Sequence, residues 1–264
     1  MKLLEYNTSE NIRAFSTYRG KGSDNYAEFN ITHYCGDTEK HVAKCRLELC
    51  KELGIEDYSL ILPRQTHDNK VICIDRKFTE QSKKRQAELL YGMDAIITDI
   101  PRICIGVSTA DCIPILLYDD TRKVIAAIHA GWRGTVADIA KECISTMHSR
   151  YGCLTDDIRA IIAPGISIDA FEVGDEVYAA FAEAGFPMTR IAMRYPAGQG
   201  EKWHIDLWEA NRLQMIAAGI RAENITIAGI CTYNNHEDFF SARRLGIKSG
   251  RIFSGILLKT DLKI

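Results

Sequence analysis

The 264-residue chain lacks the features of an exported or disulfide-stabilised protein. No positively charged segment followed by an apolar core opens the chain, so we expect no signal peptide. No apolar run approaches the roughly 20 residues of a membrane-spanning helix. The nine cysteines are odd in number and include no Cys-x-x-Cys pair, which argues against a zinc ribbon and a disulfide framework. We therefore expect a cytoplasmic protein whose thiols are reduced and mostly serve as small core residues.

An excess of one charge is also missing, because 33 basic residues face 35 acidic ones and leave a formal net charge of -2. There is no run of lysines and arginines, so we expect neither a nucleic-acid nor a membrane partner. The balanced charge does not exclude a small anionic substrate, because such a ligand needs only one or two local cations. Hydrophobic residues make up 46% of the chain and charged residues 26%, which are ordinary values for a globular protein with a sizeable core.

No linker, low-complexity segment or internal repeat divides the chain, and we expect one catalytic domain over residues 1–264. Apolar runs rich in Ile and Val, such as 113–118 and 124–129, are typical of strands buried on both faces. They alternate with segments of helical periodicity. The predicted fold class is therefore mixed α/β, with mixed sheets covered by helices.

The periodicity and the turn residues predict individual elements, although not the order of the strands. The expected strands are residues 58–62, 70–75, 94–98, 103–108, 113–118, 124–129, 159–163, 225–231 and 252–258. The expected helices are residues 38–53, 135–148, 175–181 and 206–219. Residues 76–91 are expected to be helix or loop, and residues 232–248 a polar segment.

Three residues with metal-binding side chains lie where predicted strands begin or end, namely His67, Cys112 and His129. Singly, His67 reads as a surface turn residue and Cys112 as a core cysteine. Together, a thiolate and two imidazoles are ligands that zinc prefers, and three protein ligands leave a fourth position open. A nucleophilic pair of Cys112 and His129 would give the same pattern.

Charged residues accompany these candidates. Asp111 lies between two apolar runs, where a carboxylate is costly to bury unless it is paired or bound. The turn at 130–134 contains two glycines and Arg133 before a predicted helix, which is an arrangement that can hold an anion. The alternative is a tight turn with a solvated arginine.

A second basic segment follows the predicted strand at 225–231. Ser241, Arg243 and Arg244 lie close together in it, and Arg251 comes shortly afterwards. Guanidinium groups beside a hydroxyl can bind a phosphate or a carboxylate. The alternative is a solvated basic loop.

Four segments, taken in order, resemble a known family. They are Gln-Thr-His at 65–67, Thr-Ala-Asp-Cys-Ile-Pro at 109–114, His-Ala-Gly-Trp-Arg-Gly at 129–134, and Phe-Ser-Ala-Arg-Arg at 240–244 with Gly-Arg at 250–251. They look like the YfiH-like or laccase-domain proteins, also known as polyphenol oxidases and multifunctional purine nucleoside phosphorylases. The resemblance runs from about Asn30 to the C-terminal strand. The chain departs from the pattern at Ala242, where a tyrosine is usual, and at His33.

The resemblance implies a metal site of His67, Cys112 and His129 that holds Zn²⁺, with Cu²⁺ as an alternative. It implies layers in the order α/β/β/α, phosphorolysis of adenosine, inosine and related nucleosides, and a second activity, adenosine deamination. We expect Asp111, Cys112 and Arg133 to be catalytic. We expect Arg133, together with Ser241, Arg243 and Arg244, to bind substrate or phosphate.

The expected partners are small molecules, a purine nucleoside and phosphate, and the expected oligomeric state is a monomer. Three other functions stay open. One is a copper-dependent polyphenol oxidase, although multicopper oxidases need many histidines and this chain has seven. The second is a metal-free cysteine hydrolase that uses Cys112 and His129. The third is a binding module without catalysis.

Overall fold

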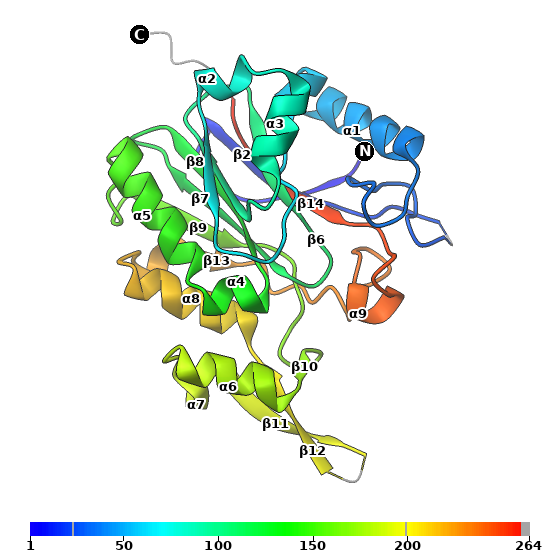
Figure 1. Ribbon diagram of the computed structural model, residues 1–264, viewed down its shortest axis with the longest axis vertical. Coiled ribbons are helices and arrows are strands. Elements are labelled where there is room, and N and C mark those ends of the chain that lie inside the picture. Colours follow the sequence, from blue (N-terminus) through cyan, green and yellow to red (C-terminus); the bar gives the residue numbers. More distant parts are fainter. Residues whose placement is uncertain (23, 199, 260–264) are drawn as a thin grey trace.

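The computed structural model describes residues 1–22, 24–198 and 200–259, and within these ranges the strands form three sheets (Figure 1). The five-stranded sheet has the order β1 (Leu3–Glu5), β2 (Ile12–Thr17), β14 (Ile252–Leu258), β6 (Cys104–Thr109) and β3 (Leu60–Ile61). The six-stranded sheet has the order β13 (Ile225–Ile227), β9 (Ile158–Ile162), β7 (Ile113–Asp119), β8 (Val124–Ala130), β5 (Ala95–Thr98) and β4 (Val71–Ile74). These two large sheets each contain parallel and antiparallel pairs, which confirms the predicted mixed sheets.

The two large sheets pack face to face, and helices cover their outer faces. Ile105 and Ile256 of the five-stranded sheet share one core with Leu116 and Ile125 of the six-stranded sheet. On its other face, the six-stranded sheet packs on α5 (Ile139–Tyr151) and α8 (Leu207–Ala217). The outer face of the five-stranded sheet packs on α1 (Glu39–Leu53). The predicted order of layers, α/β/β/α, is confirmed.

This packing explains the continuous apolar runs. Successive side chains of a strand point to opposite faces, so a strand between two layers needs apolar residues at every position. In β8, Ile125 and Ala127 belong to the core between the sheets, whereas Ala126 and Ile128 belong to the core under the helices.

Short helices complete the fold, and one predicted helix is divided. The remaining helices are α2 (Arg76–Thr79), α3 (Lys83–Leu90), α4 (Trp132–Val136), α6 (Asp175–Glu183), α7 (Met188–Ile191) and α9 (Ala242–Leu245). The helix expected over 135–148 is instead α4 followed by α5. Asp138 interrupts it with a φ of 64°, and its Oδ1 accepts a hydrogen bond of 2.6 Å from Nε2 of Gln214.

Two predicted strands are shorter in the structure. The strand expected at 225–231 ends at Ile227, and Gly229 turns the chain with a φ of 66°. The strand expected at 58–62 contains only Leu60–Ile61, because Asp57–Ser59 forms a 3-10 helix.

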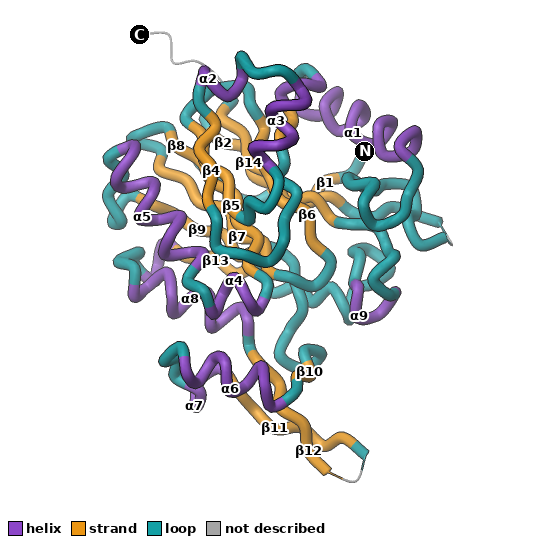
Figure 2. The backbone as a smooth tube through the Cα atoms, viewed as in Figure 1, coloured by secondary structure: helices purple, strands orange, loops and turns teal. Residues whose placement is uncertain are grey.

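A small third sheet extends from the two large ones at the lower end of Figure 1. It pairs β12 (Gly200–Ile205) with β10 (Glu172–Val173) and β11 (Ala192–Ala197), next to α6 and α7. The ring of Tyr178 stacks on Trp203 at 4.0 Å between centroids. Figure 2 shows long loops on the opposite side from α5, among them the segment between β2 and α1. None of the described helices is long and apolar enough to cross a membrane.

Candidate metal centre

His67, Cys112 and His129 come together at one end of the six-stranded sheet. Antiparallel pairing of β7 with β8 places Pro114 opposite His129, so Cys112 lies two residues from that pair. His67 reaches the same point from the turn that follows β3, where its φ is 64°. The three ligand atoms lie within 4.8 Å of one another. The sequence therefore identified three side chains that the fold does bring together.

Asp94 orients this cluster and was not among the residues predicted from the sequence. It is fully buried, and its Oδ1 lies 2.7 Å from Nδ1 of His129. A carboxylate accepts a hydrogen from Nδ1, which leaves Nε2 of His129 as the nitrogen that is free to bind a metal. The backbone N–H of His129 also donates to the carbonyl oxygen of Asp94 at 2.7 Å.

The same carboxylate holds the turn that carries His67. It accepts hydrogen bonds from the backbone N–H groups of Thr66 at 3.1 Å, His67 at 3.0 Å and Asp68 at 3.0 Å. Asp94 therefore positions two of the three candidate ligands. The sequence contains a signal for Asp94, an acidic residue directly before a buried apolar strand. The same kind of signal pointed to Asp111.

Gln65 fixes the start of this turn to β6. Its Nε2 donates to the carbonyl oxygen of Ser108 at 2.7 Å, and its Oε1 accepts from the backbone N–H of Ser108 at 3.1 Å. This two-way bond gives the amide one orientation. It ties the Gln-Thr-His segment to the five-stranded sheet, so His67 is supported from both large sheets.

Gly131 leaves the space that the cluster occupies. A Cβ at this position would lie 3.0 Å from Cδ2 of His67 and 3.1 Å from Sγ of Cys112. Both distances are shorter than ordinary van der Waals contact, so any side chain here would push the ligands apart. The first glycine of the His-Ala-Gly-Trp-Arg-Gly segment is thus required by close packing against the site.

The cluster is electrostatically coupled. Burial by itself would raise the pKa of the Cys112 thiol, but His129 and His67 outweigh burial and lower it to about 6. Burial would likewise lower the pKa of His129, whereas the Cys112 thiolate and the Asp94 carboxylate raise it to about 9. Near neutral pH the metal-free site therefore holds a thiolate beside an imidazolium, and a metal ion would displace a proton from His129.

Asp111 uses both carboxylate oxygens to hold the C-terminal segment. Its Oδ1 accepts a hydrogen bond of 2.7 Å from Oγ1 of Thr232, and its Oδ2 accepts one of 2.6 Å from the backbone N–H of Arg243. A φ of 87° at Asp111 aims the side chain in this direction. The expected pairing of this buried carboxylate is present, and its partners are a hydroxyl and a backbone amide.

The predicted substrate-binding residues occupy two positions. Arg133 is exposed in α4, two residues from Gly131, with its guanidinium carbon 4.2 Å from the centroid of the Trp132 ring. Arg243 donates two hydrogen bonds of 3.0 Å to the carbonyl oxygen of Glu172. Arg244 donates to the hydroxyl of Tyr233 at 3.2 Å, and the buried Ser241 caps α9 by accepting from the backbone N–H of Arg244.

Comparison with known proteins gives consistent matches over nearly the whole chain. The family described as multi-copper polyphenol oxidoreductase laccase matches residues 13–259. A purine nucleoside phosphorylase of Bacteroides thetaiotaomicron is 46% identical over 250 residues, which cover 94% of this chain and 92% of that protein. Adenosine deaminase RL5, from an unknown prokaryotic organism, is 46% identical over 252 residues, 95% of each chain. The crystal structure of YfiH from Bacillus licheniformis superposes with a TM-score of 0.84 at 28% identity, covering 94% of this chain and 93% of that one.

Proposed function

This chain is a member of the laccase-domain family, as the sequence analysis predicted, and we propose that it is a zinc-dependent purine nucleoside phosphorylase that also deaminates adenosine. That it is an enzyme follows from the enzymes among its near full-length relatives. The observation that carries the proposal is the convergence of His67, Cys112 and His129 within 4.8 Å. We expect a cytoplasmic monomer that acts on small molecules as one domain.

The residues present fit a zinc ion. Two imidazoles and a thiolate form a soft donor set of three, as in catalytic zinc sites. Asp94 already fixes His129 in the tautomer that exposes Nε2, and the absent side chain of Gly131 leaves room beside Sγ of Cys112. When bound there, zinc supplies Lewis acidity, which polarises an oxygen atom and lowers the pKa of water.

Phosphorolysis and deamination make different demands on the protein. In phosphorolysis, a phosphate oxygen bonds to C1′ of the ribose, the C1′–N9 bond breaks, and the purine leaves with the bonding electrons and takes up a proton. In deamination, water adds at C6 of adenosine and the amino group leaves as ammonia. Deamination needs water held beside C6 of the base, whereas phosphorolysis needs phosphate held beside C1′ of the ribose and a cation that binds it.

Arg133 is the cation best placed to bind phosphate. Its side chain is exposed and makes no ion pair within the described residues. Arg243 and Arg244 direct their guanidinium groups to Glu172 and Tyr233, so phosphate would have to share them with those partners. Asp111 acts mainly by positioning the segment that carries Arg243.

The family description favours one competing function, oxidation of phenols with several copper ions. Among the described residues, one group of His, Cys, Asp and Glu side chains is arranged to hold a metal. One such site suits single-metal chemistry, and copper would occupy it in vitro because it binds such donors more tightly than zinc does. Oxidase activity would then depend on added copper.

The test compares substrates and metals on one preparation. Protein stripped by a chelator is reloaded with zinc or with copper, and turnover of inosine and adenosine is measured with and without phosphate. The proposal predicts release of hypoxanthine that requires both zinc and phosphate, and conversion of adenosine to inosine that requires zinc alone. Copper-dependent phenol oxidation without nucleoside turnover would contradict it, as would full activity of the stripped protein, which indicates a cysteine hydrolase.

A further inference from the structure

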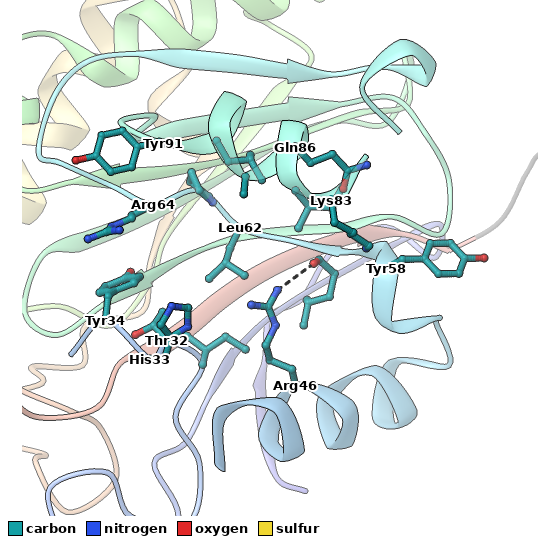
Figure 3. A pocket seen from close by; sticks show the side chains of 16 residues that line it. Thr32, His33, Tyr34, Arg46, Tyr58, Leu62, Arg64, Lys83, Gln86 and Tyr91 are labelled. Atoms are coloured by element: carbon teal, nitrogen blue, oxygen red, sulfur yellow. Dashed lines mark hydrogen bonds between the residues drawn. The ribbon is translucent and has the colours of Figure 1, made fainter. Parts of the chain in front are cut away.

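A cavity lies on the side of the five-stranded sheet where β3 forms the edge (Figure 3). Its volume is about 370 Å³, within the size range of small-molecule sites. Its walls come from the loop at 31–34, α1, β3 with the residues that follow it, and α3. His67, Cys112, His129 and Arg133 do not line it.

Three cations line this cavity, and its lining residues include no carboxylate. Arg46 comes from α1, Arg64 from the segment after β3, and Lys83 from α3. Figure 3 shows Arg46 and Lys83 directed from opposite walls into the same space. None of the three forms a salt bridge among the ion pairs of the described chain. Unpaired cations that share a concave surface create a positive potential that favours an anion.

Arg46 is the least exposed of the three cations. It is half-buried, and its guanidinium donates one long hydrogen bond of 3.4 Å, to the carbonyl oxygen of Leu60. A guanidinium has five N–H donors, so most of its hydrogen-bonding capacity stays available toward the cavity. Desolvating such a group is costly unless a ligand or water satisfies it. A phosphate matches its fork of donors.

The rest of the lining is apolar and aromatic. Ile31, Leu60 and Leu62 contribute aliphatic surface, and tyrosine rings stand at both ends of the cavity in Figure 3. The guanidinium carbon of Arg64 lies 5.9 Å from the centroid of Tyr34 and 5.3 Å from that of Tyr91. Tyrosine and arginine planes of this kind stack against flat rings.

We propose that this cavity binds a planar aromatic ring that carries a phosphate group, of the chemical class of a nucleoside monophosphate, at a site separate from the metal centre. Arg46 and Lys83 bind the phosphate, while Arg64 and the tyrosines contact the ring. The site is connected to the turn of His67 through Tyr34, whose hydroxyl is hydrogen-bonded to Ser108, the partner of Gln65.

Isothermal titration of the zinc-loaded protein with AMP and inorganic phosphate, and of Cys112→Ala with adenosine, which that variant should not turn over, tests this proposal without any measurement of turnover. AMP should bind at least about tenfold more tightly than either component, because it uses both halves of the cavity. Arg46→Met and Lys83→Met should each weaken AMP binding by about tenfold or more, the scale of a lost charge-assisted hydrogen bond. Lys44→Met and Lys84→Met remove the same charge from the same helices outside the lining and should leave the affinity within about twofold.

Thermal unfolding shows whether each variant is folded. Arg46→Lys keeps the positive charge but removes the paired N–H donors of the guanidinium. Cys112→Ala should retain AMP binding, which separates this site from the metal centre. The proposal is overturned if AMP binds no better than phosphate, if Lys44→Met is as harmful as Arg46→Met, or if AMP binding requires Cys112. Should Arg46→Met fail to fold, Lys83→Met and Arg46→Lys decide the question.

Discussion

Asp94 and His129 form a fully enclosed pair, in which Oδ1 of the carboxylate lies 2.7 Å from Nδ1 of the imidazole. Asp94 positions two of the candidate metal ligands, because the same carboxylate also accepts hydrogen bonds from the turn of His67. Outer partners of this kind commonly control the affinity of a metal site.

Asp94→Asn should therefore lower zinc affinity by about ten- to a hundredfold. An amide N–H₂ cannot accept hydrogen bonds from the backbone of Thr66 and Asp68, so the turn that carries His67 loosens. Competition with a coloured chelator measures the affinity. Asp119→Asn is the matched control, since Asp119 is equally buried and also accepts from backbone N–H groups, at Thr121 and Arg122. If both variants bind zinc like the wild type, Asp94 has no positioning role.

Gly131→Ala should weaken zinc binding by at least about tenfold while the protein stays folded. The added Cβ would lie 3.0 Å from His67 and 3.1 Å from Cys112, so the ligands must move apart. Gly200→Ala, at the start of β12, meets nothing within 4 Å and should behave as the wild type does. Zinc content after dialysis against a weak chelator separates the two variants. Equal zinc retention in both would show that the close packing at Gly131 is not needed.

In the metal-free protein, the pH dependence of the rate at which Cys112 is alkylated should reflect an unusually low thiol pKa. The thiolate is the reactive form. Because His129 and His67 lower the pKa of Cys112 to about 6, its rate of reaction with iodoacetamide should rise with pH to a plateau, with a midpoint near pH 6. Cys73 in the same sample is the internal control, since burial raises the pKa of its thiol and delays its reaction to higher pH.

His129→Gln should move the midpoint of the Cys112 profile upward, because the imidazolium that favours the thiolate is gone. Mass spectrometry of the two cysteine-containing peptides follows both rates at once. A Cys112 that reacts with the same pH profile as Cys73 would rule out the coupled thiolate and imidazolium.

Arg133→Ala should raise the KM for phosphate by about tenfold or more and leave the zinc content unchanged. The expected loss is that of a charge-assisted hydrogen bond to phosphate, about 1.5–3 kcal/mol. Initial rates of inosine phosphorolysis over a range of phosphate concentrations measure it. Arg150→Ala, an exposed arginine at the end of α5, is the control. An unchanged KM in Arg133→Ala would remove Arg133 from the phosphate site.

Local pattern predicted much of the fold. Thr38 and Gly54 bound the helix expected over 38–53, with the side chain of Thr38 accepting from the backbone N–H of His41 and Gly54 at a φ of 66°. Asp206 caps α8 as its capping-box pattern indicates. The buried strands were visible because a strand between two layers must be apolar throughout.

The sequence did not predict strands that lack an apolar run, nor the order of the strands in each sheet, which depends on distant partners. Half of the residues in the hairpin of β11 and β12 are exposed, Met193 among them, so no apolar run marks it. β14 lies between β2 and β6, and pairing over so long a stretch of sequence leaves no local signal. Asp94 and Asp119 both flank buried strands, and only the fold shows that one of them faces a histidine.

The most direct test of the central claim is the metal content of protein purified without added metal, measured for the wild type, Cys112→Ala and Cys73→Ala. Cys73 is half-buried like Cys112 but lies outside the cluster, so it controls for the loss of a thiol. We predict about one zinc per chain in the wild type and in Cys73→Ala, and loss of zinc together with phosphate-dependent release of purine base in Cys112→Ala. Full zinc content and full base release in Cys112→Ala would contradict the assignment of this site.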